Sequence, residues 1–133
     1  MQAESQAMGG HLEHWPSEIR LRDDGRTLTV RFESGECYDL PAEYLRVMSP
    51  SAEVQGHRPE ERLTIGGKRH CRMTGIAPVG SYAVRLIFDD LHSTGIFTWE
   101  YLHELGAERD AKWASYEAEL KAKGLSRDRP GEA

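Results

Sequence analysis

The sequence predicts an α+β fold: a mostly antiparallel sheet, built from a β-meander, a short helix and a further hairpin, with a C-terminal helix. Two observations support this prediction. Apolar and polar residues alternate through residues 17–40, with glycine-containing breaks between the runs. Aromatic and leucine residues then recur at helical spacing from residue 99 onward. Strands and helices do not alternate along the chain, so a parallel sheet is not expected.

The meander comes first, in SEIRLRDDGRTLTVRFESGECYDL. Every second residue of each run is apolar, as in a sheet with one solvated face: Ile19 and Leu21, then Leu28, Val30 and Phe32, then Tyr38 and Leu40. The breaks DDGR and ESGE each contain the glycine that a tight hairpin favours. Three antiparallel strands are therefore expected.

A short helix is expected in PAEYLRVM, residues 41–48. Pro41 suits a first helical position, and Tyr44, Leu45 and Met48 share one face. Residues 49–70 are rich in glycine, proline and charge and have little periodicity, which predicts a long connection.

The further hairpin is expected in RMTGIAPVG and YAVRLIFDD. Tyr82, Val84, Leu86 and Phe88 lie on one side of the second strand. Ile87 makes the other side partly apolar, which favours a central strand covered on both faces. Residues 95–97, GIF, are too few to stand alone, so we expect them to pair back across the turn that contains His92.

The helical pattern begins after Thr98, a suitable N-cap, with Glu100 in the first turn to complement the helix dipole. Gly106 weakens the helix, which resumes through residues 107–123 and stops at Gly124. The apolar positions are Trp99, Leu102, Leu105, Trp113, Tyr116 and Leu120. The stripe of Trp113 and Tyr116 suits packing on the chain's own sheet or on a neighbouring molecule.

Composition sets further limits. A chain of 133 residues predicts one domain, with disordered ends at 1–13 and 124–133. The net charge of −5, without a basic block, argues against nucleic acid as a partner. No apolar run is long enough for a membrane span and no secretory signal is visible, so we expect a cytoplasmic location with Cys37 and Cys71 reduced.

Motifs that carry chemistry are scarce. IGGKRH lacks the spacing and following helix of a phosphate-binding loop. None of the six histidines has metal-site spacing with another, although His57, His70 and His92 could converge from loops, near Cys71 or Asp90. His103, in the predicted helix, is expected to face solvent. Arg46 and Arg85 suit either anion contacts or snorkelling at a sheet edge.

Four segments add a larger pattern: WPSEIRL, YDLPAEYLRV, SPSAEVQGH and GIAPVGSYAVRLIFDDLHSTGIFTWEYLHELG. Together they resemble the gamma-butyrobetaine hydroxylase-like N-terminal domain family, over residues 14–106, with residues 107–123 as a helical extension. The most specific parts are LPAEYLRV, VGSYAVRL and D-x-H-S-T-G-I-F-T-W. The family includes N-terminal domains of iron- and 2-oxoglutarate-dependent hydroxylases, domains fused to a P-loop iron–sulfur carrier, and stand-alone bacterial proteins, which this chain resembles.

The resemblance implies where a zinc site would lie. In the hydroxylases three cysteines and a histidine hold the ion; the matching positions here are Ser49, Ser51, Val54 and His92. Serine and valine do not replace cysteine thiolates, so we expect no zinc cofactor. Leu91 stands where the family has glycine, so the His92 turn differs.

These observations favour a small non-enzymatic binding module that acts on a protein partner through Arg46, Arg85 and His92. The family resemblance implies iron–sulfur protein maturation or a metal-dependent oxygenase as its context. In this interpretation His92 closes a turn by hydrogen bonds. The first alternative is a metal-binding domain with His92 and His57 as ligands. The second is a small enzyme, for which the sequence offers no nucleophile–base pair or cofactor motif.

Overall fold

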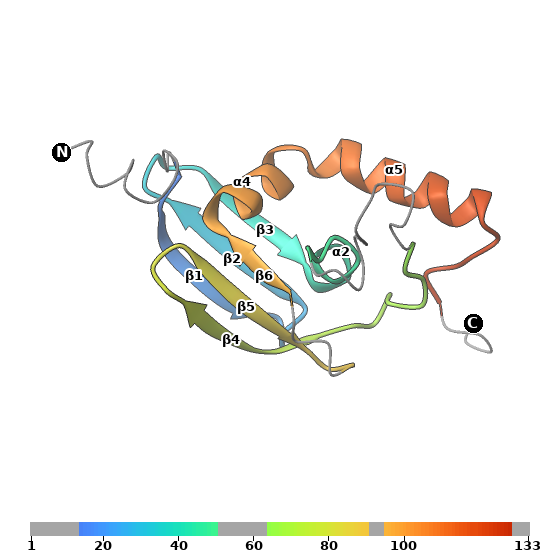
Figure 1. Ribbon diagram of the computed structural model, residues 1–133, viewed down its shortest axis with the longest axis horizontal. Coiled ribbons are helices and arrows are strands. Elements are labelled where there is room, and N and C mark those ends of the chain that lie inside the picture. Colours follow the sequence, from blue (N-terminus) through green and yellow to red (C-terminus); the bar gives the residue numbers. More distant parts are fainter. Residues whose placement is uncertain (1–13, 51–63, 91–94, 129–133) are drawn as a thin grey trace.

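The computed structural model of the chain describes residues 14–50, 64–90 and 95–128, in which the elements form an α+β fold (Figure 1). The bounds of the elements are β1 Pro16–Arg22, β2 Thr27–Phe32, β3 Cys37–Pro41, α2 Ala42–Val47, β4 Met73–Val79, β5 Ala83–Phe88, β6 Ile96–Thr98, α4 Trp99–Ala107 and α5 Arg109–Ala122. The predicted fold class is confirmed.

The first sheet is the predicted meander, in the order β1-β2-β3 with antiparallel pairing throughout. The turn between β1 and β2 places Asp23, Asp24 and Gly25 at positive φ. Gly25 also touches the other sheet, because its carbonyl accepts a 2.7 Å hydrogen bond from the backbone N–H of Met73. A Cβ at Gly25 would lie 2.2 Å from the Met73 carbonyl oxygen, so this corner requires glycine.

The second sheet has the order β4-β5-β6 and is also antiparallel. The prediction that β5 is the central strand is confirmed, whereas its predicted cover on both faces is only partial, since Arg85 is exposed and Ile87 half-buried. The pairing of the GIF segment is also confirmed: β6 pairs along β5, with Ile96 opposite Arg85 and Phe97 opposite Val84. Three residues form a strand here only because a longer neighbour supplies its hydrogen-bond partners.

The core contains the inner faces of both sheets together with residues of α2, α4 and α5. In Figure 1 the helices α4 and α5 lie along one side of the molecule, and α2 lies below α5. The largest fully buried side chains are Tyr44, Tyr116, Phe32, Phe88, Phe97, Leu28, Leu40, Leu45, Leu86, Leu102, Leu105 and Val30. No helix within the described ranges has the length and apolarity that crossing a membrane requires.

The helices begin and end for local reasons. Pro41 ends β3, and α2 starts one residue later than expected, at Ala42. The predicted N-cap of α4 is confirmed, since the Thr98 hydroxyl accepts a hydrogen bond from the N–H of Tyr101 at 3.1 Å. Helix α4 ends beside Gly106, and α5 begins after Glu108. The Tyr116 stripe packs on the chain's own core, since that side chain is 1% exposed.

Residues 124–128, which we call the C-terminal strap, follow α5 back across the molecule. The N–H of Gly67 donates to the carbonyl of Ser126, and the N–H of Arg69 donates to that of Arg127. Arg127 also forms two hydrogen bonds to the buried carboxylate of Glu43 in α2, at 2.7 and 2.8 Å. The sequence assigned these residues to a disordered tail; the division of the chain into domain and tail stays a prediction.

Candidate functional site

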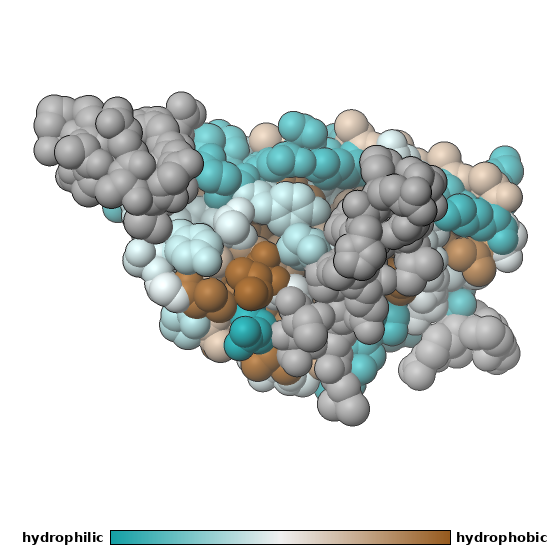
Figure 2. Space-filling model, viewed as in Figure 1, coloured by the Kyte–Doolittle hydropathy of each residue, from teal (hydrophilic) through white to brown (hydrophobic). Residues whose placement is uncertain are grey.

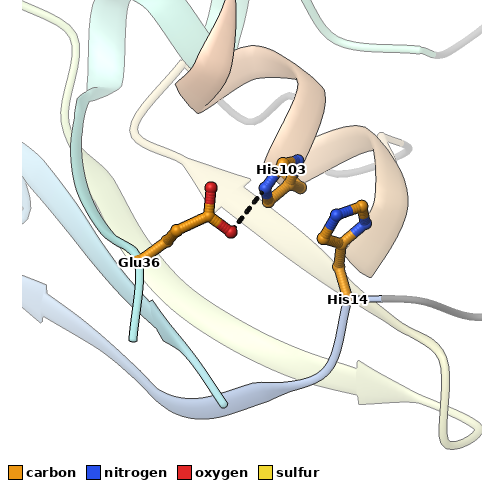
Figure 3. A group of neighbouring side chains, drawn as sticks. All are labelled: His14, Glu36 and His103. Atoms are coloured by element: carbon orange, nitrogen blue, oxygen red, sulfur yellow. Dashed lines mark hydrogen bonds and ion pairs between the residues drawn. The ribbon is translucent and has the colours of Figure 1, made fainter. Parts of the chain in front are cut away.

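Three side chains with metal-ligating atoms meet at one end of the first sheet (Figure 3). His14 precedes β1, Glu36 lies in the turn between β2 and β3, and His103 lies in α4. One ligand atom from each lies within 4.8 Å of the other two. We call these three residues the His–Glu–His cluster.

The two imidazoles of the cluster stack, with ring centroids 3.6 Å apart and planes inclined by 17°. Nε2 of His103 donates to Oε1 of Glu36 at 2.9 Å. Both histidines are partly shielded from solvent, and Glu36 is more exposed, so the cluster opens to solvent on the side of the carboxylate.

A fourth residue, Glu100 in the first turn of α4, fixes His14. Oε1 of Glu100 accepts from Nδ1 of His14 at 2.7 Å, and Oε2 accepts from the backbone N–H of His14 at 3.0 Å. Glu100 and His103 are three residues apart on one helix, so they project from the same face. The helix thus holds one residue of the cluster and the residue that orients another.

Aromatic rings form the base of the cluster. Phe32 meets both imidazoles edge-on, with centroid distances of 6.2 Å to His14 and 5.2 Å to His103. Tyr38 meets His103 at 5.7 Å, and its hydroxyl donates to Oε2 of Glu36 at 3.1 Å. These contacts limit how far the His103 ring can move.

The electrostatic state of Glu36 follows from these contacts. The hydrogen bond from His103, followed by one from Ser34, lowers the pKa of the Glu36 carboxyl from its ordinary value of 4.5. Glu36 is therefore ionised at neutral pH. Desolvation by burial, together with the Glu36 carboxylate, raises the pKa of the Tyr38 hydroxyl. The cluster thus combines two imidazoles with one anionic oxygen ligand.

The structure describes only some of the residues that the sequence singled out. His57 and His92 lie outside the described residues. Arg46 is buried, with 7% of its surface exposed, and Nε donates to Oδ2 of Asp90 at 2.9 Å. Its Nη1 has no hydrogen-bond partner within the described part of the chain. Arg85 is exposed on β5. Because Arg46 is buried, it does not share an exposed surface with Arg85.

The two cysteines differ in exposure and, for Cys71, burial disfavours a role as a nucleophile. Cys37 is exposed and Cys71 is buried, and both are free thiols, as predicted. Burial, and then the charges of Asp90 and Asp89, raise the pKa of the Cys71 thiol to about 12. A thiol with that pKa is protonated at neutral pH and is a weak nucleophile.

Two surface hollows accompany the helices. One, of about 410 Å³, lies between α2, α5 and the strap, and its lining includes Glu43, Trp113 and Arg127. The other, of about 500 Å³, lies along α4 and α5 and is lined mainly by charged residues and Tyr101 and Tyr116. The His–Glu–His cluster lines neither hollow.

Sequence reasoning missed the cluster. It predicted that His103 faces solvent, but the side chain is 16% exposed and bonded to Glu36. Neither His14 nor Glu36 received a role. The available signal was the E-x-x-H spacing of Glu100 and His103, which places two metal-ligating side chains on one helical face.

Several solved structures are similar to this chain over most of its length. An NMR solution structure is 50% identical, with 90% of this chain and 94% of that chain covered and a TM-score of 0.76. A second NMR structure is 35% identical, covering 90% and 92%, with a TM-score of 0.74. No curated protein matches the chain.

A crystal structure of a protein of unknown function from Acidithiobacillus ferrooxidans, described as belonging to the DUF971 family, is 42% identical over 70% of this chain and 93% of that one, with a TM-score of 0.59. Residues 19–103 match the family described as gamma-butyrobetaine hydroxylase-like, N-terminal. Together with the similarity of the solved structures, this match shows that the chain belongs to the gamma-butyrobetaine hydroxylase-like N-terminal domain family.

Proposed function

We propose that the chain is a small non-enzymatic binding module that acts in the cytoplasm through contacts with a protein partner. The observation that supports this proposal is the outer face of the β4-β5-β6 sheet, which is mostly apolar. Figure 2 shows apolar side chains gathered over these strands, with a hydrophilic one among them.

The residues of this face follow from the strand register. In antiparallel sheets directly paired residues point to the same side. On β5 the outward residues alternate with the buried Val84, Leu86 and Phe88. With their partners on β4 and β6, the outer-face residues are Gly75, Ala77, Val79, Ala83, Arg85, Ile87, Ile96 and Thr98. Ala83 is fully buried, so the accessible surface comes from the other residues of this set. Arg85 is the one charged residue in this set.

An apolar sheet face with one arginine suits a protein interface. Ile96 is 36% exposed although its side chain is large and apolar, and Arg85 pairs directly with it. Burying such side chains against a partner stabilises a complex by about 25 cal/mol for each Å² of apolar surface. Arginine is enriched in interface cores because its guanidinium binds carboxylates in a bidentate way and stacks on aromatic rings.

The kind of partner that we propose rests on the family alone. Since members of the family occur with iron–sulfur carriers and metal-dependent oxygenases, we take the partner to be a metalloprotein of one of these two kinds. Of the predicted interaction residues, Arg85 suits this surface because it is exposed on β5. Arg46 is buried, so we do not include it in the proposed interface. The role of His92 stays a prediction.

The test is capture of a partner by the purified chain under anaerobic conditions, with the captured protein identified and its iron measured. We expect an iron–sulfur carrier or iron-dependent oxygenase to be recovered. Arg85→Glu or Ile96→Asp should weaken its binding about tenfold or more, equivalent to about 1.4 kcal/mol. Arg22→Glu, which changes an exposed arginine of β1 in the other sheet, is the matched control. Recovery of no metalloprotein, or equal loss in the control, would contradict the proposal.

A further inference from the structure

We propose that the His–Glu–His cluster is a binding site for a first-row transition-metal dication of the zinc or cobalt type, with His14, Glu36 and His103 as ligands. The site is different from the one that His57 and His92 were predicted to form. It also lies apart from the outer face of the β4-β5-β6 sheet, so neither proposal depends on the other.

The type of ion follows from the ligand atoms. Two imidazole nitrogens and one carboxylate oxygen match the preference of Zn²⁺ and Co²⁺ for mixed nitrogen and oxygen ligands. Calcium and magnesium prefer oxygen ligands, so two histidines disfavour them. Three protein ligands leave a fourth position for water, and the exposure of Glu36 gives water access to it.

The spacing of the ligand atoms is close to what an ion requires. Bonds of about 2.1 Å in a tetrahedral site place neighbouring ligand atoms about 3.4 Å apart. Nε2 of His103 and Oε1 of Glu36 now lie 2.9 Å apart, so an ion needs this hydrogen-bonded pair to open by about half an ångström. The full set lies within 4.8 Å, so closure onto an ion requires side-chain shifts of about an ångström.

A carboxylate already orients one ligand. Metal-bound histidines commonly donate their other ring nitrogen to a carboxylate, which fixes the ring and raises its basicity. Glu100 does this for His14: it accepts from Nδ1 at 2.7 Å, which leaves Nε2 as the nitrogen for an ion. The second oxygen of Glu100 accepts a hydrogen bond from the backbone N–H of His14, so the main chain of this residue is held in place as well.

The stacked rings define the change that binding must produce. An ion lies in the plane of each imidazole that binds it, whereas rings 3.6 Å apart and nearly parallel do not direct their nitrogens at one point. One ring therefore rotates when the ion binds. Protons compete for the imidazole nitrogens, so affinity falls as the solution is acidified.

The experiment is titration of the untagged, chelator-treated full chain with Zn²⁺ by calorimetry and with Co²⁺ by visible absorption. We expect one equivalent to bind, with absorption bands of four-coordinate cobalt. His14→Ala and Glu36→Gln should each weaken binding at least tenfold, and Glu100→Gln about tenfold through loss of orientation. In NMR spectra, the ring signals of His14 and His103 should shift on addition of Zn²⁺.

Two variants separate ligation from a structural role. His103→Gln keeps an amide donor that can reach Glu36, so it should preserve the melting temperature yet weaken ion binding at least tenfold. His70→Ala removes an exposed histidine that precedes Cys71 and should leave binding unchanged. The proposal is overturned if neither ion binds at about tenfold excess, or if binding survives the cluster substitutions or is lost equally in His70→Ala.

Discussion

At the scale of single residues, the charge of Glu36 depends on a named neighbour, His103. The hydrogen bond from His103 is the largest cause of the lowered pKa of its carboxyl. A carboxyl with a lowered pKa in the folded state stabilises the fold above its unfolded value, near 4.5, and this contribution is lost as the pH falls through the lowered value.

We therefore predict that His103→Ala raises the pKa of Glu36 toward 4.5, since the substitution removes the main donor to the ionised form. The measurement is an NMR titration of the side-chain carboxyl carbon in both proteins. Ser34→Ala removes a smaller contribution and should produce a smaller rise in the same pKa. An unchanged Glu36 pKa in His103→Ala would show that the hydrogen bond does not persist in solution.

At the scale of elements, Gly106 in α4 has a different role from the one that helix propensity suggests. The sequence identifies it as a weak point of the helix. In the fold the ring of Tyr38, on β3, lies against its Cα, and a Cβ there would come within 2.4 Å of ring atoms. The glycine therefore allows α4 to pack closely on the sheet.

Gly106→Ala is predicted to destabilise the protein by about 1–3 kcal/mol through overpacking, although alanine favours a helix by about 1 kcal/mol. Urea denaturation measures the change. In a Tyr38→Ala background the same substitution should be neutral or stabilising, because the ring that it meets is gone. Destabilisation of equal size in both backgrounds would refute the close-packing argument.

The elements themselves were largely predictable, because their signals are local. The alternation of Leu28, Val30 and Phe32 fixes which face of β2 is buried, and all three are buried. The N-cap at Thr98 could likewise be predicted from the adjacent residues alone. By contrast, nothing near Gly106 in the sequence indicates Tyr38, since the contact joins an early strand to a late helix.

For the whole molecule, the two sheets are joined at the Gly25 corner. Gly25 has a φ of +85°, and its Cα faces the backbone of Met73 at the start of β4. Gly25→Ala is predicted to cost about 3 kcal/mol or more, because the new methyl group meets a carbonyl oxygen of the other sheet. Thermal and urea denaturation test this.

Gly35→Ala is the matched control. Gly35 has a φ of +100°, yet a Cβ there would meet nothing within 4 Å. It should therefore cost only the left-handed backbone strain of about 1–2 kcal/mol. The difference between the two variants in free energy of unfolding measures the effect of the contact between the sheets. Equal losses of stability would show that backbone strain alone explains both.

The candidate site was hidden from the sequence for the same reason as the Tyr38 contact. His14 and Glu100 are 86 positions apart, and Glu36 and His103 are 67 apart. They meet only because the chain before β1, the β2–β3 turn and α4 converge at one end of the meander. Spacing rules find ligands within one loop or helix, and here they could detect Glu100 with His103 alone.

The difference between the two thiols has a practical use. Cys71 is buried and its thiol is protonated at neutral pH, whereas Cys37 is open to solvent. A maleimide fluorophore offered to the unaltered chain will attach at one position. That position follows Glu36 and precedes Tyr38, the β3 residue whose ring contacts His103. Neighbouring strand residues point to opposite faces, so the dye will lie near the His–Glu–His cluster without occupying it. Cys37 is therefore a natural labelling site. Quenching of the attached dye by cobalt will report binding of the ion at low protein concentration.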